Sequence, residues 1–101
     1  MSKLFEYFGL IVFFYSNEHE PVHVHGRYQG LESRAELVIF DGLVVEIKIT
    51  DVKGKRPLEG KTLNDFKRLV ELHTEDIVQK WIDYFVYNKS FKAEKITQRL
   101  K

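Results

Sequence analysis

The sequence predicts an α+β domain with a four-stranded, mostly antiparallel sheet, two helices packed on one face of it, and a short basic tail. Two observations indicate this order. Apolar runs rich in β-branched and aromatic residues fill residues 8–50, and such residues favour strands. From residue 62 to about residue 87 the apolar residues recur at helical spacing instead. A chain of 101 residues can bury one modest core, so we expect one domain over residues 1–101, ending in a tail at 88–101.

The composition is that of a folded domain. Hydrophobic residues make up 44% and charged residues 31% of the chain, which argues against disorder. Cysteine is absent, which excludes disulfides and thiolate ligands, so a metal site would need His, Asp or Glu. The absence of cysteine agrees with the reducing cytoplasm, where we expect the protein to reside. The apolar run "FGLIVFFY" is too short to span a bilayer.

Four segments are predicted strands: residues 9–16, 21–28, 32–40 and 43–50. The first, "GLIVFFYS", is apolar on both faces, which is typical of a central strand. The second, "PVHVHGRY", alternates, so its valines face one side of the sheet while His23, His25 and Arg27 face the other.

Two dipeptides are predicted to connect the last three strands as hairpin turns. Asp41-Gly42 is a strong signal for a two-residue turn, because such turns require positive φ at both positions. Gln29-Gly30 is a weaker signal of the same kind. If both are two-residue turns, counting fixes the register. The count places three cross-strand pairs on one face: Arg27 with Glu32, His25 with Arg34, and His23 with Glu36.

Two helices follow a loop that contains Gly, Pro and Lys. Thr62 is the expected start of the first helix, since "TLND" resembles a capping box with Asp in place of Glu. Thr74 is expected to cap the second helix, which runs to about Tyr87. His73 lies at the end of the first helix, where a protonated imidazole would suit the helix dipole. Trp81 has helical spacing from other apolar residues and is predicted to lie in the core.

The stretch "HEPVHVHG" holds three of the four histidines. His23 and His25 lie two residues apart on a predicted strand, so their imidazoles can converge on one divalent metal ion such as zinc. His19 supplies a third nitrogen if the chain bends at Pro21, which leaves an open position for a water whose pKa the metal lowers. Such a site would support hydrolysis of a phosphodiester.

Two alternatives need no metal. In the first, one histidine acts as general base and the other as general acid, while Arg27 or Arg34 stabilises the charge of the phosphate. Glu36 would then raise the pKa of His23 and make it the acid. In the second, these residues have no chemical role and are half-exposed strand residues, paired with Glu and Arg across the sheet for modest stability. The residues alone do not choose among the three interpretations.

The net charge of +1 is unevenly distributed. Residues 88–101 carry five basic groups and one acidic group, a local charge of +4. Such a tail can bind nucleic acid or an acidic partner, and the alternative is a solvated terminus. Ile96 and Leu100 in this tail are spaced for either a short helical turn or an added strand. The candidate contact residues are Lys89, Lys92, Lys95 and Arg99, together with Arg34 in the sheet.

The histidine stretch and the two helices resemble a known family. "FFYSNEHEPVHVHGRYQG" resembles the motif of the small bacterial proteins grouped as domain of unknown function 4160, in which an aromatic strand leads into H-x-P-P-H-x-H and a glycine-containing turn. "LNDFKRLVELHTEDIVQKW" is similar to the helix pair of that family. The chain departs from the motif where Val22 replaces a second proline and Val24 an aromatic residue. The resemblance places six residues at motif positions: His19, Pro21, His23, His25, His73 and Trp81.

The resemblance implies no established activity, but it implies a protein partner. Members of the family look like partners in compact two-gene units, an arrangement similar to toxin–antitoxin pairs. We therefore expect a protein-interaction module with a partner encoded nearby, whose contact surface is the sheet face that carries His23, His25 and Arg27. Phosphodiester hydrolysis and nucleic-acid binding through the basic tail are the alternatives.

Overall fold

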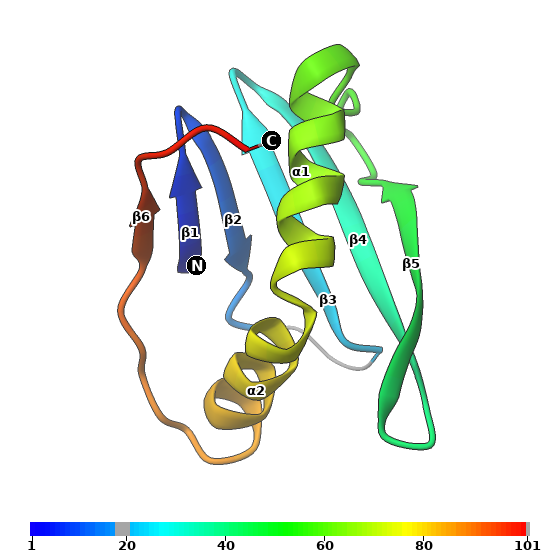
Figure 1. Ribbon diagram of the computed structural model, residues 1–101, viewed down its shortest axis with the longest axis vertical. Helices are drawn as coiled ribbons and strands as arrows, with labels where there is room; N and C mark the ends of the chain where they lie inside the picture. Colours follow the sequence, from blue (N-terminus) through cyan, green and yellow to red (C-terminus); the bar gives the residue numbers. More distant parts are fainter. Residues whose placement is uncertain (18–20, 101) are drawn as a thin grey trace.

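A computed structural model of the chain describes residues 1–17 and 21–100. The strands of the described residues build one sheet in the order β5-β4-β3-β2-β1-β6, and both helices lie on one face of it (Figure 1). The predicted α+β class is confirmed. The elements in chain order are β1 (Ser2–Tyr7), β2 (Leu10–Phe14), β3 (His23–Tyr28), β4 (Leu31–Phe40), β5 (Leu43–Asp51), α1 (Gly60–Leu72), α2 (Thr74–Phe85) and β6 (Glu94–Ile96).

The described sheet has six strands, two more than the sequence predicted. One of the added strands, β1, pairs antiparallel with β2 through a turn at Phe8 and Gly9, whose φ angles are 45° and 90°. A bulky residue such as phenylalanine seldom adopts positive φ, so this turn has no strong sequence signal. The predicted strand at residues 9–16 is consequently shorter, because its first residue belongs to the turn.

The other added strand, β6, belongs to the basic tail and pairs in parallel with β1, with Glu6 opposite Lys95. Of the two conformations that the spacing of Ile96 and Leu100 allows, the structure therefore has the strand. Both of these side chains pack against the core. The Leu100 amide also donates a hydrogen bond to the Tyr7 hydroxyl at 3.0 Å. The tail is thus attached to the edge of the sheet.

Both predicted hairpin turns are confirmed. Gln29 and Gly30 have φ angles of 48° and 82°, while Asp41 and Gly42 have φ angles of 54° and 79°. These are the positive values that a two-residue turn between twisted antiparallel strands requires.

The turns fix the register that the sequence predicted. Between β4 and β5 the register shifts after Val38, because Val45 is inserted as a β-bulge. Between β3 and β4 the pairs are those counted from the sequence: Arg27 with Glu32, His25 with Arg34, and His23 with Glu36.

The first helix, α1, begins earlier than predicted. Its first residue is Gly60, and its N-cap, Glu59, makes no side-chain capping hydrogen bond. Thr62 lies inside the first turn, so the predicted capping box is wrong. The contact before the helix explains the early start: the buried Leu58 has its amide hydrogen-bonded to the Ser33 hydroxyl of β4 at 2.9 Å, which brings the chain onto the sheet at this point.

The core lies between the helices and the sheet. The second helix, α2, buries Ile77 and Trp81. Its N-cap is His73, which makes no side-chain capping hydrogen bond, so the prediction that Thr74 caps the helix is wrong: Thr74 is its first residue, and the helix ends at Phe85, two residues before the predicted end. The first helix approaches β3 closely at Gly26, where an added Cβ would lie 2.6 Å from Cδ1 of Phe66. Only glycine fits this contact without a shift of the ring or the strand. In the described part of the chain, neither helix is long and apolar enough to cross a membrane.

Candidate functional site

Two of the polar residues predicted on β3, His25 and Arg27, lie on the sheet face opposite the helices. Gly26 faces α1, as its close contact with that helix shows, and successive residues of a strand point to opposite faces. His25 and Arg27 therefore point away from the helices, together with the residues opposite them on β4, Arg34 and Glu32. The grouping of these side chains on one face follows the sequence prediction.

The centre of this face is a buried carboxylate, that of Glu32, whose exposed fraction is 0%. The Tyr15 hydroxyl donates a hydrogen bond to its Oε2 at 2.8 Å, and Nδ1 of His25 lies 3.2 Å from the same oxygen. Nε of Arg27 donates to Oε1 at 3.3 Å. Nη2 of Arg27 also donates to the Tyr15 hydroxyl at 3.2 Å. We call these four side chains the Glu32 network.

Aromatic packing covers the network from the β2 side. Phe13 of β2 is fully buried. Its ring stacks on that of His25 with centroids 5.5 Å apart, and the Arg27 guanidinium lies 4.9 Å from the centroid of the same ring. The network therefore joins β2, β3 and β4 through side chains as well as through the backbone.

The network fixes the protonation of two of its members. Burial raises the pKa of the Tyr15 hydroxyl, and the hydrogen bond to the Glu32 carboxylate raises it further. The pKa of Arg27 is also raised, first by its hydrogen bond to Tyr15 and then by that to Glu32. Tyr15 thus remains a neutral donor and Arg27 a cation, and neither is suited to giving up its proton near neutral pH.

His23 and His25 are buried, with exposed fractions of 3% and 5%, so the expectation that they are half-exposed is wrong. Nδ1 of His23 lies 2.7 Å from the carbonyl oxygen of Pro21, and its ring lies 5.3 Å from that of Trp81 in α2. The two histidine rings are themselves 5.3 Å apart. The physical reason is the packing around them, since the rings of Phe13 in β2 and Trp81 in α2 contact this part of β3.

Two of the three predicted zinc ligands, His23 and His25, belong to the described residues. His19, the third ligand, lies outside the described residues. Within residues 1–17 and 21–100, no cluster of three or more His, Asp or Glu side chains could hold a metal ion. The zinc site therefore remains a prediction.

The remaining residues of the polar face pair with each other. Nη2 of Arg34 lies 3.6 Å from Oε1 of Glu36, and both side chains are partly exposed. Nε of Arg34 and the Thr50 hydroxyl, which stand opposite each other on β4 and β5, are buried with no hydrogen-bond partner among the described residues. Arg34 and Glu36 thus lie in the predicted patch. Among the described residues, neither forms a hydrogen bond or an ion pair with the Glu32 network.

The two motif residues of the helices have structural positions. Trp81 is buried, as predicted, and its ring packs edge-on against Phe14 with centroids 5.4 Å apart. His73 ends α1 and precedes α2, and its ring lies 4.6 Å from that of Phe5 in β1.

The basic residues predicted in the tail are exposed: Lys89, Lys92, Lys95 and Arg99. They do not form one basic surface with the sheet face. The guanidinium of Arg99 lies 3.8 Å from the ring centroid of Phe8, at the turn between β1 and β2. Lys89 lies near the end of α2, where it lines a hollow of about 400 Å³.

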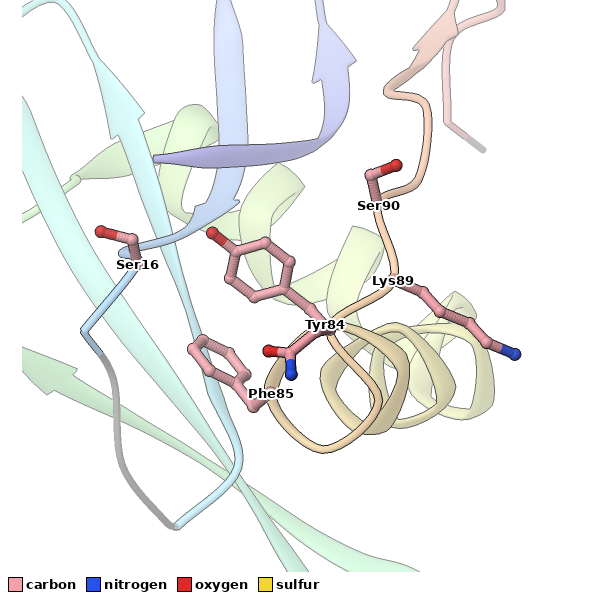
Figure 2. A pocket seen from close by; sticks show the side chains of 6 residues that line it. Ser16, Tyr84, Phe85, Lys89 and Ser90 are labelled. Atoms are coloured by element: carbon pink, nitrogen blue, oxygen red, sulfur yellow. The ribbon is translucent and has the colours of Figure 1, made fainter.

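This hollow lies between the end of β2 and the end of α2 (Figure 2). Tyr84 and Phe85 project into it from α2, Ser16 borders it from the opposite side, and Lys89 extends away from the two rings. Because both rings pack against the core, little of them beyond their edges is exposed to the hollow. Neither His23 nor His25 lines it.

A second surface, which the sequence did not single out, lies at the turn of the β4–β5 hairpin. Four apolar side chains are exposed here, and we call them the apolar tip: Ile39 (41%), Phe40 (73%), Leu43 (69%) and Val45 (59%). Beside the tip is a groove of about 430 Å³ between the hairpin and α2. The groove is lined by Ile39, Gly42, Leu43, Val44, Thr74, Glu75, Val78 and Gln79.

Two features of these sites escaped the sequence prediction. Glu32 was predicted opposite Arg27, but the strand pairing does not predict two of its contacts: the Tyr15 hydroxyl donates to its carboxylate, and its amide donates to the carbonyl of Arg56 in the loop after β5 at 2.9 Å. The strand pattern at residues 32–40 and 43–50 predicts Phe40 and Leu43 beside the turn, and a hairpin long enough to extend past the helices is the signal that could have indicated their exposure.

The fold and the site together define a small α+β protein whose central sheet face holds a buried Glu–His–Arg–Tyr network. The chain matches the model of the family described as "Domain of unknown function (DUF4160)" over residues 9–82, and it belongs to this family. The match spans β2 to most of α2, so it includes the histidine motif and the apolar tip and omits β1 and β6. No curated protein and no solved structure matches the chain.

Proposed function

We propose that the chain is a protein-interaction module of a toxin–antitoxin-like pair, and that it binds its partner through the apolar tip and the adjoining groove. The observation that carries the proposal is the gathering of four exposed apolar side chains on one hairpin. Single exposed apolar residues are ordinary, but four on one hairpin, two of which line a groove, are typical of a protein contact surface.

The charges around the groove indicate the chemistry of the partner. Glu75 is the charged residue that lines it, and the neighbouring hollow along β5 is lined by Glu46 and Glu71. A segment with apolar side chains for the groove and Lys or Arg at its flanks would be complementary to this surface. We therefore propose a partner that presents an apolar segment with basic flanks.

Phosphodiester hydrolysis has less support. A general acid or base must reach its substrate, and His23 and His25 are almost fully buried. The charge of Arg27, which would stabilise a phosphate, is balanced by Glu32 at 3.3 Å. Binding of nucleic acid through the tail also has less support, since β6 and Arg99 are held against β1 and its turn.

Co-expression with the protein encoded beside this chain tests the proposal. A tag on that neighbour should recover the wild-type chain, and Phe40→Asp/Leu43→Asp should reduce the recovery at least tenfold, because each charge would be buried in an apolar contact. The matched control is Val86→Asp/Tyr87→Asp, which changes two equally exposed apolar residues, each 61% exposed, outside the tip.

Three results would contradict the proposal. They are recovery of the tip variant at the wild-type level, equal loss in the control variant, and RNA cleavage by the isolated chain that is abolished by His25→Ala. If the pair acts as toxin and antitoxin, replacing the wild-type chain with the tip variant should change the growth of cells that express both proteins, and replacing it with the control variant should not.

A further inference from the structure

The outer edge of β5 is the longest open strand edge in the described sheet. β5 has nine residues and is the first strand of the order, so one of its edges has no neighbour among the described strands (Figure 1). The opposite edge of the sheet ends in β6, which has only three residues. β5 contains no proline, and its devices against edge pairing are the bulge at Val45 and one lysine, Lys48.

We infer that β5 pairs with β5 of a second copy of this chain, antiparallel and centred on Ile47, so that two sheets join into one. This inference goes beyond the proposed function and does not depend on it, because it rests on the backbone edge and the charges of β5, although the pair would also cover Val45 of the apolar tip.

Symmetry limits the registers that such a pair can have. Two identical edges pair antiparallel only about a two-fold axis perpendicular to the sheet, which keeps the same face upward in both copies. Residues opposite each other must then point to the same face, so one residue at the centre lies opposite its own copy. Each possible register is therefore defined by its central residue.

The charges of β5 select one of these registers. With Ile47 at the centre, Glu46 of each copy lies opposite Lys48 of the other, and both contacts are attractive. A centre at Glu46 or Lys48 would place a charge opposite itself. A centre at Ile49 would leave Lys48 opposite the uncharged Thr50. Of the registers centred on Glu46, Ile47, Lys48 and Ile49, the register centred on Ile47 is therefore the one that places opposite charges across from each other.

The two faces of the joined strands have different character in this register. Glu46 and Lys48 stand opposite Val38 and Glu36 of β4, on the face away from the helices, and Glu46, next to the bulge at the open edge, also borders the hollow that Glu71 lines. Ile47 and Ile49 lie on the helix side, opposite the buried Leu37 and Ala35. Pairing would place Ile47 beside its copy and Val45, now 59% exposed, opposite Ile49. Apolar contacts would therefore form on one face and ion pairs on the other.

Charge exchange tests the register by sedimentation equilibrium over a range of protein concentrations. The wild type should dimerise, and Glu46→Lys should weaken the dimer roughly tenfold or more, since both attractive pairs become repulsive. The doubly exchanged Glu46→Lys/Lys48→Glu should restore it. Glu46 lies opposite Val38, so its exchange breaks no ion pair within the copy, and circular dichroism should show an unchanged fold.

A cysteine cross-link tests the same register without changing a charge. The chain has no cysteine, so Ile47→Cys introduces a single thiol. Residues opposite each other in an antiparallel pair lie at a distance that a disulfide can bridge, so oxidation should convert this variant to covalent dimers. In the matched control Leu43→Cys, the two thiols would be displaced by roughly 27 Å along the strands and should not cross-link.

The inference is overturned if the wild type remains a monomer at about 100 µM, a concentration at which even a weak specific dimer is populated. It is also overturned if the wild type dimerises but Glu46→Lys has no effect, or if Leu43→Cys cross-links as readily as Ile47→Cys. If the wild type is a monomer and still binds the protein encoded beside it through the apolar tip, this inference is wrong and the proposed function is retained.

Discussion

The two ends of β4 reverse the usual relation between polarity and burial. Near the start of this strand, Glu32 is a charged residue with an exposed fraction of 0%. At its other end, Phe40 is a large apolar residue with an exposed fraction of 73%. Figure 1 shows that β4 starts at one end of the sheet and that the hairpin turn after it lies at the opposite end. At the first end, Tyr15, His25 and Arg27 enclose the Glu32 carboxylate. One strand thus carries an internal polar contact and an external apolar surface.

The histidine motif and the apolar tip, which is the proposed contact surface, therefore lie in separate parts of the molecule. The motif residues are tied to Glu32 and to aromatic rings, which stabilises the arrangement of three strands. The apolar tip makes little contribution to the fold and is free to be covered by another protein. Substitutions at the two ends should therefore differ in how much they change the free energy of unfolding.

The largest expected effect is that of Glu32→Ala. The substitution removes the acceptor of three donors, but water can solvate Arg27, whose side chain is 37% exposed, so the free energy of unfolding should fall by about 2–3 kcal/mol. Urea denaturation followed by circular dichroism measures it. The control is Glu36→Ala, whose partly exposed pair with Arg34 should contribute no more than about 1 kcal/mol. Equal losses for the two variants would show that the network is not the stronger contact.

The next effect is that of Gly26→Ala at the contact between β3 and α1. The new methyl group would overlap the ring of Phe66, and overpacking of this kind costs about 1–3 kcal/mol of stability. The loss should be smaller when Phe66→Leu is already present, because leucine leaves more room. Additive losses in this double-mutant cycle would mean that the overlap is relieved elsewhere.

A smaller effect is expected for Tyr15→Phe, which deletes the hydroxyl between Glu32 and Arg27. The loss of these hydrogen bonds should lower the free energy of unfolding by about 1–1.5 kcal/mol near neutral pH. Tyr87→Phe, at an exposed tyrosine, should have almost no effect.

The same variant has a pH signature. The pKa of Tyr15 is raised in the folded protein above its ordinary value of 10.0. The folded state therefore holds this proton more tightly, and the associated stability is present below about pH 10 and is lost as the pH rises further. The difference in stability between wild type and Tyr15→Phe should shrink in that alkaline range. A constant difference would argue against the raised pKa.

The smallest effect on stability is expected at the other end of β4. Phe40→Ser and Leu43→Ser should change the free energy of unfolding by less than about 0.5 kcal/mol, because both side chains are already in water. Recovery by the neighbouring protein should nevertheless fall. A large loss of stability here would show that the tip is part of the fold and would remove the contrast between the two ends.

Local signals determined how much of this molecule could be predicted. Asp41-Gly42 and Gln29-Gly30 encode their own turns, and counting from them gave every cross-strand pair of the histidine face. Phe8-Gly9 makes a turn of the same kind but with an atypical residue, so β1 was missed. The burial of Glu32 and of the histidines involves contacts with Phe13, Tyr15 and Trp81, which lie on other elements of the chain. No local pattern reports such contacts.

The parallel pairing of β6 with β1 has a consequence for the order in which the protein folds. The hairpins β1–β2, β3–β4 and β4–β5 connect residues close in sequence, so each can form soon after its strands are made. The contact between Tyr7 and Leu100 joins residues 93 positions apart. During synthesis from the amino end, the edge of β1 therefore stays open until the residues of β6 have left the ribosome. The pairing of β6 with β1 has to wait until the other strands and both helices have been synthesised.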